Sequence, residues 1–161
     1  MIVVDASILS FYLIAGERTA HANALRHLDA EWMVPVFWRV EFQSILWKYV
    51  RFGGMPAAKA LPLFDRALDL FSINEVAPSP DGVLRDALLW GITVYDAQYV
   101  SLARQLGVVC VTEDGPVQAA CPGLAVSVGA FLAGRPPSGT VKEARASYRT
   151  RRREARSGGR R

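Results

Sequence analysis

Four carboxylates stand at positions where a folded protein gains little from an unpaired charge. Asp5 directly follows the apolar N-terminal residues, and Asp114 follows a second apolar run, Val108–Val111. Glu41 and Asp96 each lie on the apolar side of a predicted helix. Burying a lone carboxylate is costly unless it is paired or bound to a cation. Acids that converge without matching bases therefore predict a divalent-metal site, and Mg²⁺ or Mn²⁺ is the ion that oxygen ligands suit.

Glu41 is the least expected of the four. An apolar stripe at the spacing i, i+4, i+7 and i+11 runs along the predicted helix 38–52 and consists of Trp38, Phe42, Ile45 and Tyr49. Glu41 stands three residues after Trp38 and four before Ile45, so it lies on this stripe. The alternative is a residue at the edge of the face, with its carboxylate in water or paired with Arg39 or Lys48. Taken alone, Glu41 favours that alternative.

Each of the three aspartates also has an alternative role as a helix N-cap, a common position for Asp. Asp96 opens the predicted helix 96–106, Asp5 precedes a helix from Ala6, and Asp114 precedes a short helix from Pro116 or lies in a plain turn. The four acids together favour a shared site. Successive strands of a parallel sheet bring the residues that follow them to one edge, and four neighbouring carboxylates repel one another unless a cation is bound.

Short apolar runs alternate with helical patterns along the chain. Strands are predicted at Met1–Val4, Trp32–Val36, Phe71–Val76, Val108–Thr112 and Leu124–Val128. Helices are predicted at Ala6–Ala15, Thr19–Leu28, Trp38–Phe52, Pro56–Leu70, Asp81–Trp90, Asp96–Leu106 and from Pro116, with a final turn at Gly129–Leu132. Continuous apolar strands that alternate with helices are typical of an α/β fold with a mainly parallel sheet covered on both faces.

The composition predicts one globular domain with a basic extension. The chain has 161 residues, of which 51% are hydrophobic. No apolar run approaches the roughly 18 residues of a membrane span, and no basic leader with a cleavage site is visible. We therefore expect a cytoplasmic protein without a membrane partner. Cys110 and Cys121 have no metal-ligand spacing and no disulfide pattern.

Charge divides the chain at about residue 134. Residues 1–134 hold 9 basic and 13 acidic residues, whereas residues 135–161 hold ten basic and two acidic ones, a net charge of +8. We predict a domain over 1–134 and a basic tail over 135–161. The tail is either a solvated, flexible extension or a segment that binds RNA phosphates. The second interpretation uses a cluster of basic side chains: Arg149, Arg151, Arg152 and Arg153.

Three sequence motifs resemble those of PIN domains. Val4-Asp5-Ala6-Ser7-Ile8-Leu9 resembles the opening of that family, and Tyr95-Asp96-Ala97-Gln98-Tyr99 with the residues up to Ala103 resembles its third acidic motif. Val111-Thr112-Glu113-Asp114 resembles the fourth, and Glu41 matches the helical Glu in order and spacing. The resemblance covers residues 1–134, and the size is most similar to VapC-type toxins. It implies a three-layer α/β/α sandwich with a central, mainly parallel sheet.

The resemblance also implies an activity, an endoribonuclease that depends on Mg²⁺ or Mn²⁺. The residues that would hold the metal and carry out catalysis are Asp5, Glu41, Asp96 and Asp114. By the same resemblance Ser7 would hydrogen-bond near Asp5, and Thr112 would orient Asp114. The chain departs from the family after the fourth acid, where Gly115-Pro116 replaces a frequent basic residue. Glu113 is a competing ligand there.

The implied partners are RNA, a cognate antitoxin and a second copy of the chain. The antitoxin would offer an Arg or Lys to the carboxylates, and the helices 38–52 and 56–70 leave an apolar face for a dimer. Two alternatives stay open, a PIN-domain RNA-processing nuclease without a toxin role and a non-catalytic RNA-binding module. Haloacid-dehalogenase-like enzymes are excluded, because Ser7 stands where their second Asp would be.

Overall fold

Four short strands form the sheet in the computed structural model, which describes residues 1–134. The strands are β1 (Ile2–Val4), β2 (Trp32–Met33), β3 (Cys110–Val111) and β4 (Ala125–Val126), in the spatial order β2-β1-β3-β4. Every pairing is parallel, and the two central strands place Val4 opposite Val111. Nearly all strand residues are buried, as expected for a sheet covered on both faces. The predicted α/β class is confirmed.

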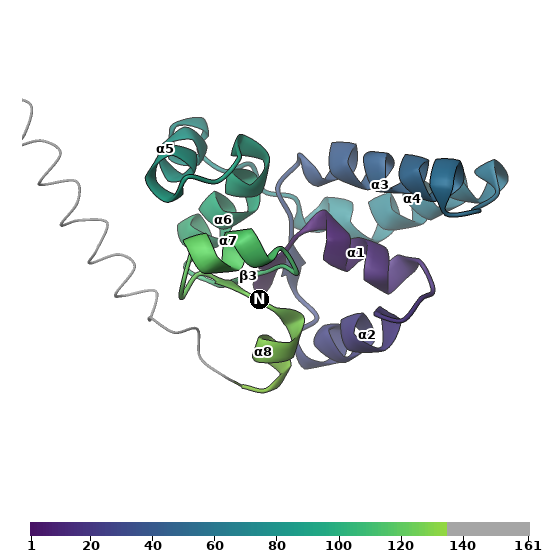
Figure 1. Cartoon of the computed structure of the whole chain (residues 1–161), viewed down its shortest axis with the longest axis horizontal. Helices are drawn as coiled ribbons and strands as arrows, with labels where there is room; N and C mark the ends of the chain where they lie inside the picture. Colours follow the sequence, from purple (N-terminus) through teal and green to yellow (C-terminus); the bar gives the residue numbers. More distant parts are fainter. Residues whose placement is uncertain (135–161) are drawn as a thin grey trace, which may run out of the picture.

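Helices connect all of these strands. They are α1 (Ala6–Leu13), α2 (Thr19–Leu28), α3 (Trp38–Phe52), α4 (Ala57–Phe71), α5 (Pro80–Trp90), α6 (Val94–Leu106), α7 (Gly115–Ala120) and α8 (Val128–Leu132). Two of them, α3 and α4, lie side by side and project from the body of the molecule (Figure 1). Among residues 1–134, no helix has the length and apolar character that crossing a bilayer requires.

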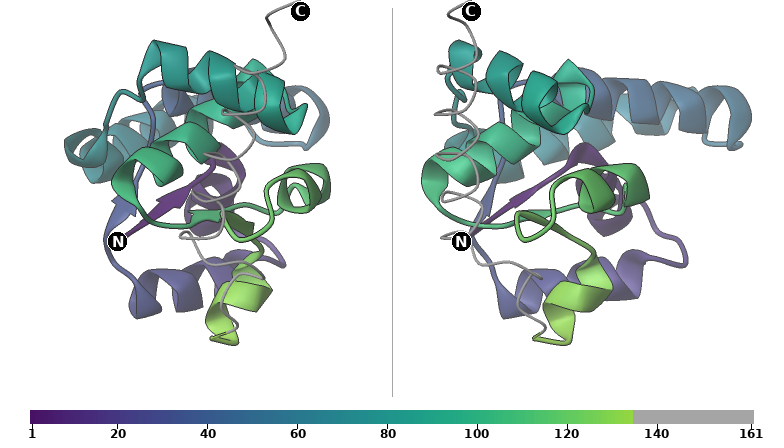
Figure 2. Two further views of the ribbon diagram at one scale, coloured as in Figure 1. Left: turned by 90° about the vertical axis from the view of Figure 1, so that its left-hand side faces the viewer. Right: turned by 60° about the vertical axis from the view of Figure 1, so that its left-hand side comes forward.

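The helices lie on both sides of the sheet. Figure 2 shows α5 and α6 above the strands and α2 and α8 below them. Helix α6 contacts both central strands, β1 and β3, and α2 packs against α8 on the opposite side. This arrangement confirms the expected three-layer sandwich. The predicted basic tail, with Arg149 and Arg151–Arg153, lies outside the residues that the structure describes.

The predicted strand Phe71–Val76 is wrong. Phe71 is the last residue of α4, and a turn of 3₁₀ helix, η1 (Ser72–Asn74), follows it. Only Glu75 pairs with the sheet, through a single parallel bridge to Val34. The apolar residues of this run do not share an environment, because Phe71 is fully buried whereas Ile73 is 87% exposed. The segment therefore closes a helix and does not extend the sheet.

A cluster of buried aromatic rings fixes α3 and α4 to the edge of the sheet. Trp32 of β2 stacks on Phe71 with 6.1 Å between ring centroids, and Trp38 of α3 meets Phe71 edge-on at 6.2 Å. All three rings are fully buried. Trp38 also donates from Nε1 to Glu75 Oε1 at 2.6 Å. These contacts determine where α3 lies, and α3 carries Glu41.

Candidate active site

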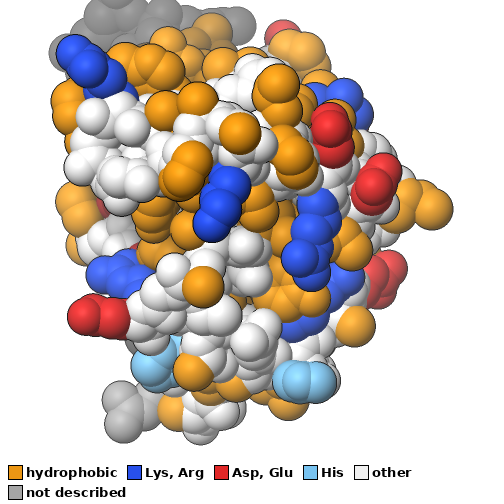
Figure 3. Space-filling model, turned by 90° about the vertical axis from the view of Figure 1, so that its right-hand side faces the viewer, with side chains coloured by type: hydrophobic (Ala, Val, Ile, Leu, Met, Phe, Trp, Pro, Cys, Tyr) orange, Lys and Arg blue, Asp and Glu red, His pale blue; other side chains and the backbone are white. Residues whose placement is uncertain are grey.

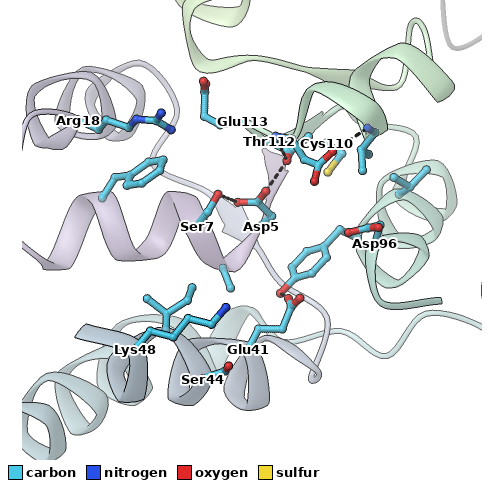
Figure 4. Close-up of a pocket in the computed structure, with 17 residues that line it drawn as sticks. Asp5, Ser7, Arg18, Glu41, Ser44, Lys48, Asp96, Cys110, Thr112 and Glu113 are labelled. Atoms are coloured by element: carbon cyan, nitrogen blue, oxygen red, sulfur yellow. Dashed lines mark hydrogen bonds between the residues drawn. The ribbon is translucent and has the colours of Figure 1, made fainter. Parts of the chain in front are cut away.

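A cavity of about 400 Å³ lies at the carboxyl edge of the central strands. All four predicted site acids line it, from four different elements of the chain (Figure 4). Asp5 follows β1, Asp114 follows β3, Glu41 lies on α3 and Asp96 on α6. The strand-end geometry expected from the sequence thus brings these side chains to one place.

Asp5 lies at the centre of this group and is also the N-cap of α1. Its Oδ1 accepts hydrogen bonds from Ser7 Oγ at 2.6 Å and from Ile8 N at 3.0 Å. Its Oδ2 accepts from the hydroxyl of Thr112. Burial raises the pKa of this carboxyl, and the hydrogen bonds from Ser7, Thr112 and the backbone oppose that shift. Capping and a place in the cavity are therefore compatible roles.

Glu41 occupies the cavity side of α3. Its Oε2 accepts a hydrogen bond from the phenol of Tyr99. Burial is the main cause that raises the pKa of Glu41 to about 7, and the charges of Asp5 and Asp96 add to it. The alternative pairing with Arg39 is not observed, because that guanidinium binds Glu75 through Nε at 2.6 Å. Lys48 lines the same cavity without an ion pair to Glu41 among residues 1–134.

Asp96 is not the N-cap that its position suggested. Helix α6 begins at Val94, and Thr93 is the cap. Thr93 Oγ1 accepts from the backbone N of Asp96 at 3.2 Å and donates to Asp96 Oδ2 at 2.6 Å, so the Thr93 hydroxyl contacts both the backbone and the side chain of Asp96. The acid belongs to the first turn of the helix, where a negative charge is favoured. It holds one oxygen against Thr93 while it lines the cavity.

Asp114 and Glu113, neighbours in the sequence, have different environments. Asp114 caps α7 by accepting from Val117 N at 2.9 Å. Glu113 Oε1 accepts from Val128 N at 2.9 Å, and Figure 4 shows this side chain on the side of Arg18, away from Asp96. Thr112 was expected to orient Asp114. It accepts from Asp114 N at 3.0 Å, but its own proton goes to Asp5.

The donor set suits a hard divalent cation. All four side chains offer carboxylate oxygens, which Mg²⁺ and Mn²⁺ prefer. No ion pair within residues 1–134 neutralises any of the four. The acids share one cavity without converging on a single point, since no group of three acid, His or Cys side chains in this part of the chain is close enough together to hold one ion. Unbalanced negative charge gathered in one cavity, with Asp5, Glu41 and Asp96 partly buried, supports the fit to a cation.

Sequence reasoning missed Tyr99 and Arg18 as side chains of the cavity, and it considered Lys48 only as a possible ion-pair partner of Glu41. Tyr99 was counted as core on the apolar side of its helix, although its distance of three residues from Asp96 places both on one face. Lys48 had a usable signal, because it is seven residues after Glu41 on the same helix. Arg18 lies between α1 and α2, where no periodic pattern marks it.

Comparison with known proteins agrees with this geometry. The sequence profile of the PIN domain matches residues 2–119. Ribonuclease VapC3 of Pyrobaculum aerophilum is 30% identical over 127 residues, which cover 76% of this chain and 96% of that protein. Exonuclease VapC9 of the same organism is 39% identical over 74 residues, or 46% of this chain and 55% of the other.

A solved structure gives the same fold. The crystal structure of PAE2754 from Pyrobaculum aerophilum superposes with a TM-score of 0.65 and 30% sequence identity. The superposition covers 83% of this chain and 95% of that one. The likeness therefore extends over most of the chain.

Proposed function

The chain belongs to the PIN domain family, and from that premise we propose that it is a metal-dependent endoribonuclease, the toxin of a toxin–antitoxin pair. One observation carries the proposal, the cavity in which Asp5, Glu41, Asp96 and Asp114 lie without a basic partner among the described residues. The relative named Ribonuclease VapC3, nearly all of which this chain covers, supports RNA as the substrate.

The four acids would hold Mg²⁺ or Mn²⁺ in this mechanism. Such an ion, when bound, lowers the pKa of a water molecule and offsets the negative charge of the phosphate. Ser7 and Thr112 hold the two oxygens of Asp5, so this carboxylate has little freedom to turn. Tyr99 does the same for Glu41. Fixed ligands reduce the reorganisation that substrate binding requires.

Glu41 is the candidate for the proton transfer. Tyr99 occupies its Oε2, which leaves Oε1 free of hydrogen bonds within residues 1–134. We assign to Oε1 the proton of the attacking water, because this oxygen faces the cavity side of α3 and accepts no hydrogen bond from the described residues. Water attacks the phosphorus, the P–O3′ bond breaks, and the leaving 3′-oxygen takes up a proton from solvent, so the RNA 2′-hydroxyl is not needed as nucleophile. The products are then a 5′-phosphate and a 3′-hydroxyl.

The test is RNA cleavage by the purified protein, with the ends mapped. Single-stranded RNA is incubated with EDTA, with Mg²⁺ and with Mn²⁺. The proposal expects cleavage with either metal, none with EDTA, and 5′-phosphate ends that a phosphate-dependent exonuclease accepts. Cleavage in EDTA, or 2′,3′-cyclic phosphate ends, would contradict the mechanism.

An exonuclease is the second candidate, because one relative carries that name. A closed circular RNA separates the two, since it has no end for an exonuclease to attack. An endoribonuclease converts the circle to linear products, whereas an exonuclease leaves it intact. The same circle also tests the non-catalytic RNA-binding module, which would bind it without cutting.

Two protein partners belong to the proposal. An antitoxin segment would bring an Arg or Lys to the acids, because an acidic cavity without its metal attracts a cation. A second copy of the chain would cover apolar side chains of α3 and α4, where Trp47, Phe52 and Leu61 are exposed. Apolar atoms are prominent on the side from which these helices project (Figure 3). We propose that these proteins meet in the cytoplasm.

The antitoxin and the second copy of the chain are tested by different experiments. The product of the adjacent gene, expressed with this chain, should form a complex and inhibit RNA cleavage. An absence of both effects would remove the toxin role and leave the processing nuclease. Light scattering on the chain alone measures the dimer, and Trp47→Glu should convert it to a monomer, with the exposed Leu88→Glu of α5 as the control.

A further inference from the structure

A second cavity of about 440 Å³ lies directly beside the first. Phe11, Arg18 and Glu113 line both cavities, so these three side chains stand between them. Other residues line the second cavity but not the first, among them His21 of α2, Ser127 and Gly129. Its volume is within the range of small-molecule sites, which hold ligands of about nucleotide size. The proposed mechanism makes no use of it.

Arg18 is the cation at the junction. Its guanidinium lies over the ring of Phe11, with 4.8 Å between the guanidinium carbon and the ring centroid. Within residues 1–134, no acid is paired with it. Stacking on a ring holds a guanidinium in place and leaves its N–H donors in the ring plane available. Those donors match the oxygens of a phosphate.

The charges that line the first cavity bear on where the RNA phosphates would lie relative to Arg18. Figure 4 shows Arg18 and Lys48 on one side of Asp5, whereas Asp96 lies on the opposite side. A strand of RNA that places one phosphate at the acids must bring the neighbouring phosphate close by. The acidic side repels that second phosphate, and Arg18 attracts it. Glu17 and Glu113 also line the second cavity, so the attraction is local to Arg18, which would hold the phosphate at the junction while the attached nucleoside enters that cavity.

We propose that the second cavity binds a nucleotide of the substrate strand next to the one that is cut, with Arg18 on the connecting phosphate. This inference rests on the proposed ribonuclease function and adds a substrate-positioning site to it. Glu17 and Glu113 supply carboxylate acceptors around the cavity, although Glu113 Oε1 already accepts from Val128 N, and Ser127 supplies a hydroxyl that can donate. Carboxylates accept only, so they favour a base with N–H donors on its edge and disfavour one that presents acceptors alone.

The test blocks the cavity and measures RNA binding. A Cβ on Gly129 would meet only Ser127 Oγ, at 4.0 Å, so the backbone accepts a side chain there. Gly129→Phe then fills the cavity with a ring, and Ala58→Phe adds the same ring to an exposed site on α4 as the control. The probe is a fluorescent 12-nucleotide single-stranded RNA of mixed sequence, and its anisotropy is measured with the full-length protein in EDTA.

Gly129→Phe should raise the Kd for this RNA at least tenfold, and Ala58→Phe should not change it. Arg18→Ala should weaken binding and lower the slope of log K against log salt by about one, as expected for one lost phosphate contact. Arg66→Ala, on the exposed side of α4, should leave the slope as it is. If Gly129→Phe does not melt cooperatively, His21→Trp fills the same cavity from α2.

RNA binding within twofold of wild type in a folded, cavity-filled variant would overturn the proposal. If that variant instead loses only the complex with the adjacent gene product, the cavity serves a protein and the proposal is equally wrong. Failure of the ribonuclease function is distinguishable, because it shows as no cleavage by the wild-type protein. The binding measurement needs no catalysis and gives its answer in either case.

Discussion

Asp5 has three structural roles. It ends β1, caps α1 through Ile8 N, and faces the cavity with its charge. The hydrogen bonds from Ser7 and Thr112 stabilise the ionised form, but burial still raises the pKa of the group. The residue is therefore held in a form that a cation would stabilise further.

We predict that Asp5→Asn keeps the fold and loses RNA cleavage. An amide oxygen still accepts from Ser7 Oγ and Ile8 N, so the cap survives. An amide is a poor ligand for a hard cation, and loss of an outer partner alone typically costs roughly 10- to 100-fold in such sites. Cleavage should fall by more than that, whereas the melting temperature in EDTA should stay the same or rise. Asp69→Asn, an exposed acid on α4, is the control, and an active Asp5→Asn protein would refute the role.

For single residues, the sequence predicted the acids of the cavity better than it predicted the side chains that hydrogen-bond to them. Charge in apolar surroundings predicted all four acids, which line one cavity: Asp5, Glu41, Asp96 and Asp114. Tyr99 was missed because a buried tyrosine in a helix has the same pattern whether its hydroxyl meets a carboxylate or nothing. The partner of Thr112 was also missed, since Asp5 is more than a hundred residues away in the chain and only the β1–β3 pairing brings them together.

Glu75 links two elements that position the site. It bridges to Val34 at the sheet edge and accepts from both Trp38 and Arg39 of α3. The hydrogen bond from Arg39 lowers the pKa of Glu75, and the one from Trp38 contributes to the same effect. This carboxylate is therefore more acidic in the folded than in the unfolded protein, and its ionised form stabilises the fold.

We predict a pH dependence from this shift. A lowered folded pKa contributes stability that is fully present above the unfolded value of 4.5 and is lost as the pH falls through the folded value. Glu75→Gln should therefore melt at a lower temperature than wild type at pH 7, and the difference should shrink below about pH 4.5. Asp65→Asn, an exposed acid on α4, should show no such convergence. A constant difference at all pH values would contradict the assigned cause.

An ion pair connects α5 to α6, the helix that carries Asp96 and Tyr99. Arg104 Nε donates to Asp86 Oδ2 at 2.9 Å. Asp86 is fully buried, and its other oxygen, Oδ1, has no hydrogen-bond partner in the described part of the chain. The side chain of Arg104 keeps 27% of its surface exposed. Asp86 is therefore the more deeply buried of the two partners.

Arg104→Met should destabilise the protein more than Asp86→Asn. The methionine leaves a fully buried carboxylate without its cation, which costs on the order of 3 kcal/mol in such pairs. The asparagine instead leaves a guanidinium that can turn toward solvent. Urea unfolding of both variants and of the double variant measures the difference. An equal loss in the two single variants would show that the burial of Asp86 does not govern the pair.

The helices were predictable at this scale, and so were the positions of four of the five expected strands, but the run 71–76 was not. Glycine ended α6 as expected, because Gly107 adopts a positive φ of 73° that other residues avoid. The strands are only two or three residues long, so an apolar run such as 71–76 has the composition of a strand whether or not it pairs. Helix α6 starts at Val94 and not at Asp96, two residues earlier than expected, because the Thr93 hydroxyl accepts from Asp96 N and caps the helix.

Positive charge is concentrated at the end of the sequence. Residues 135–161 carry a net charge of +8, and deletion of 136–161 tests what that charge does. We predict weaker RNA binding and a flatter salt dependence, because each lost phosphate contact lowers the slope. Cleavage at saturating RNA should survive, since all four acids lie upstream. Unchanged binding with the same salt slope would show that the extension does not contact RNA.

Family membership and fold could be predicted from the sequence, because the motifs around Asp5, Asp96 and Asp114 occur in the same order as in PIN domains. The second cavity was not readable, since its lining comes from α1, α2 and α8, whose residues are distant in the sequence and follow no common pattern. Surfaces assembled from several elements depend on how the helices pack. Hydrophobic periodicity alone does not determine that packing.

Calorimetric titration with Mn²⁺ tests the central claim, that the four acids form a cation site. The metal-free wild-type protein should bind Mn²⁺ with a saturable heat at pH 8, and binding should weaken at pH 5.5, where protons compete for carboxylates such as Glu41. Glu41→Gln and Asp5→Asn should each reduce the affinity, and Asp69→Asn should not. If wild type and Asp5→Asn bind Mn²⁺ equally, or neither binds it, the cavity is not a metal site.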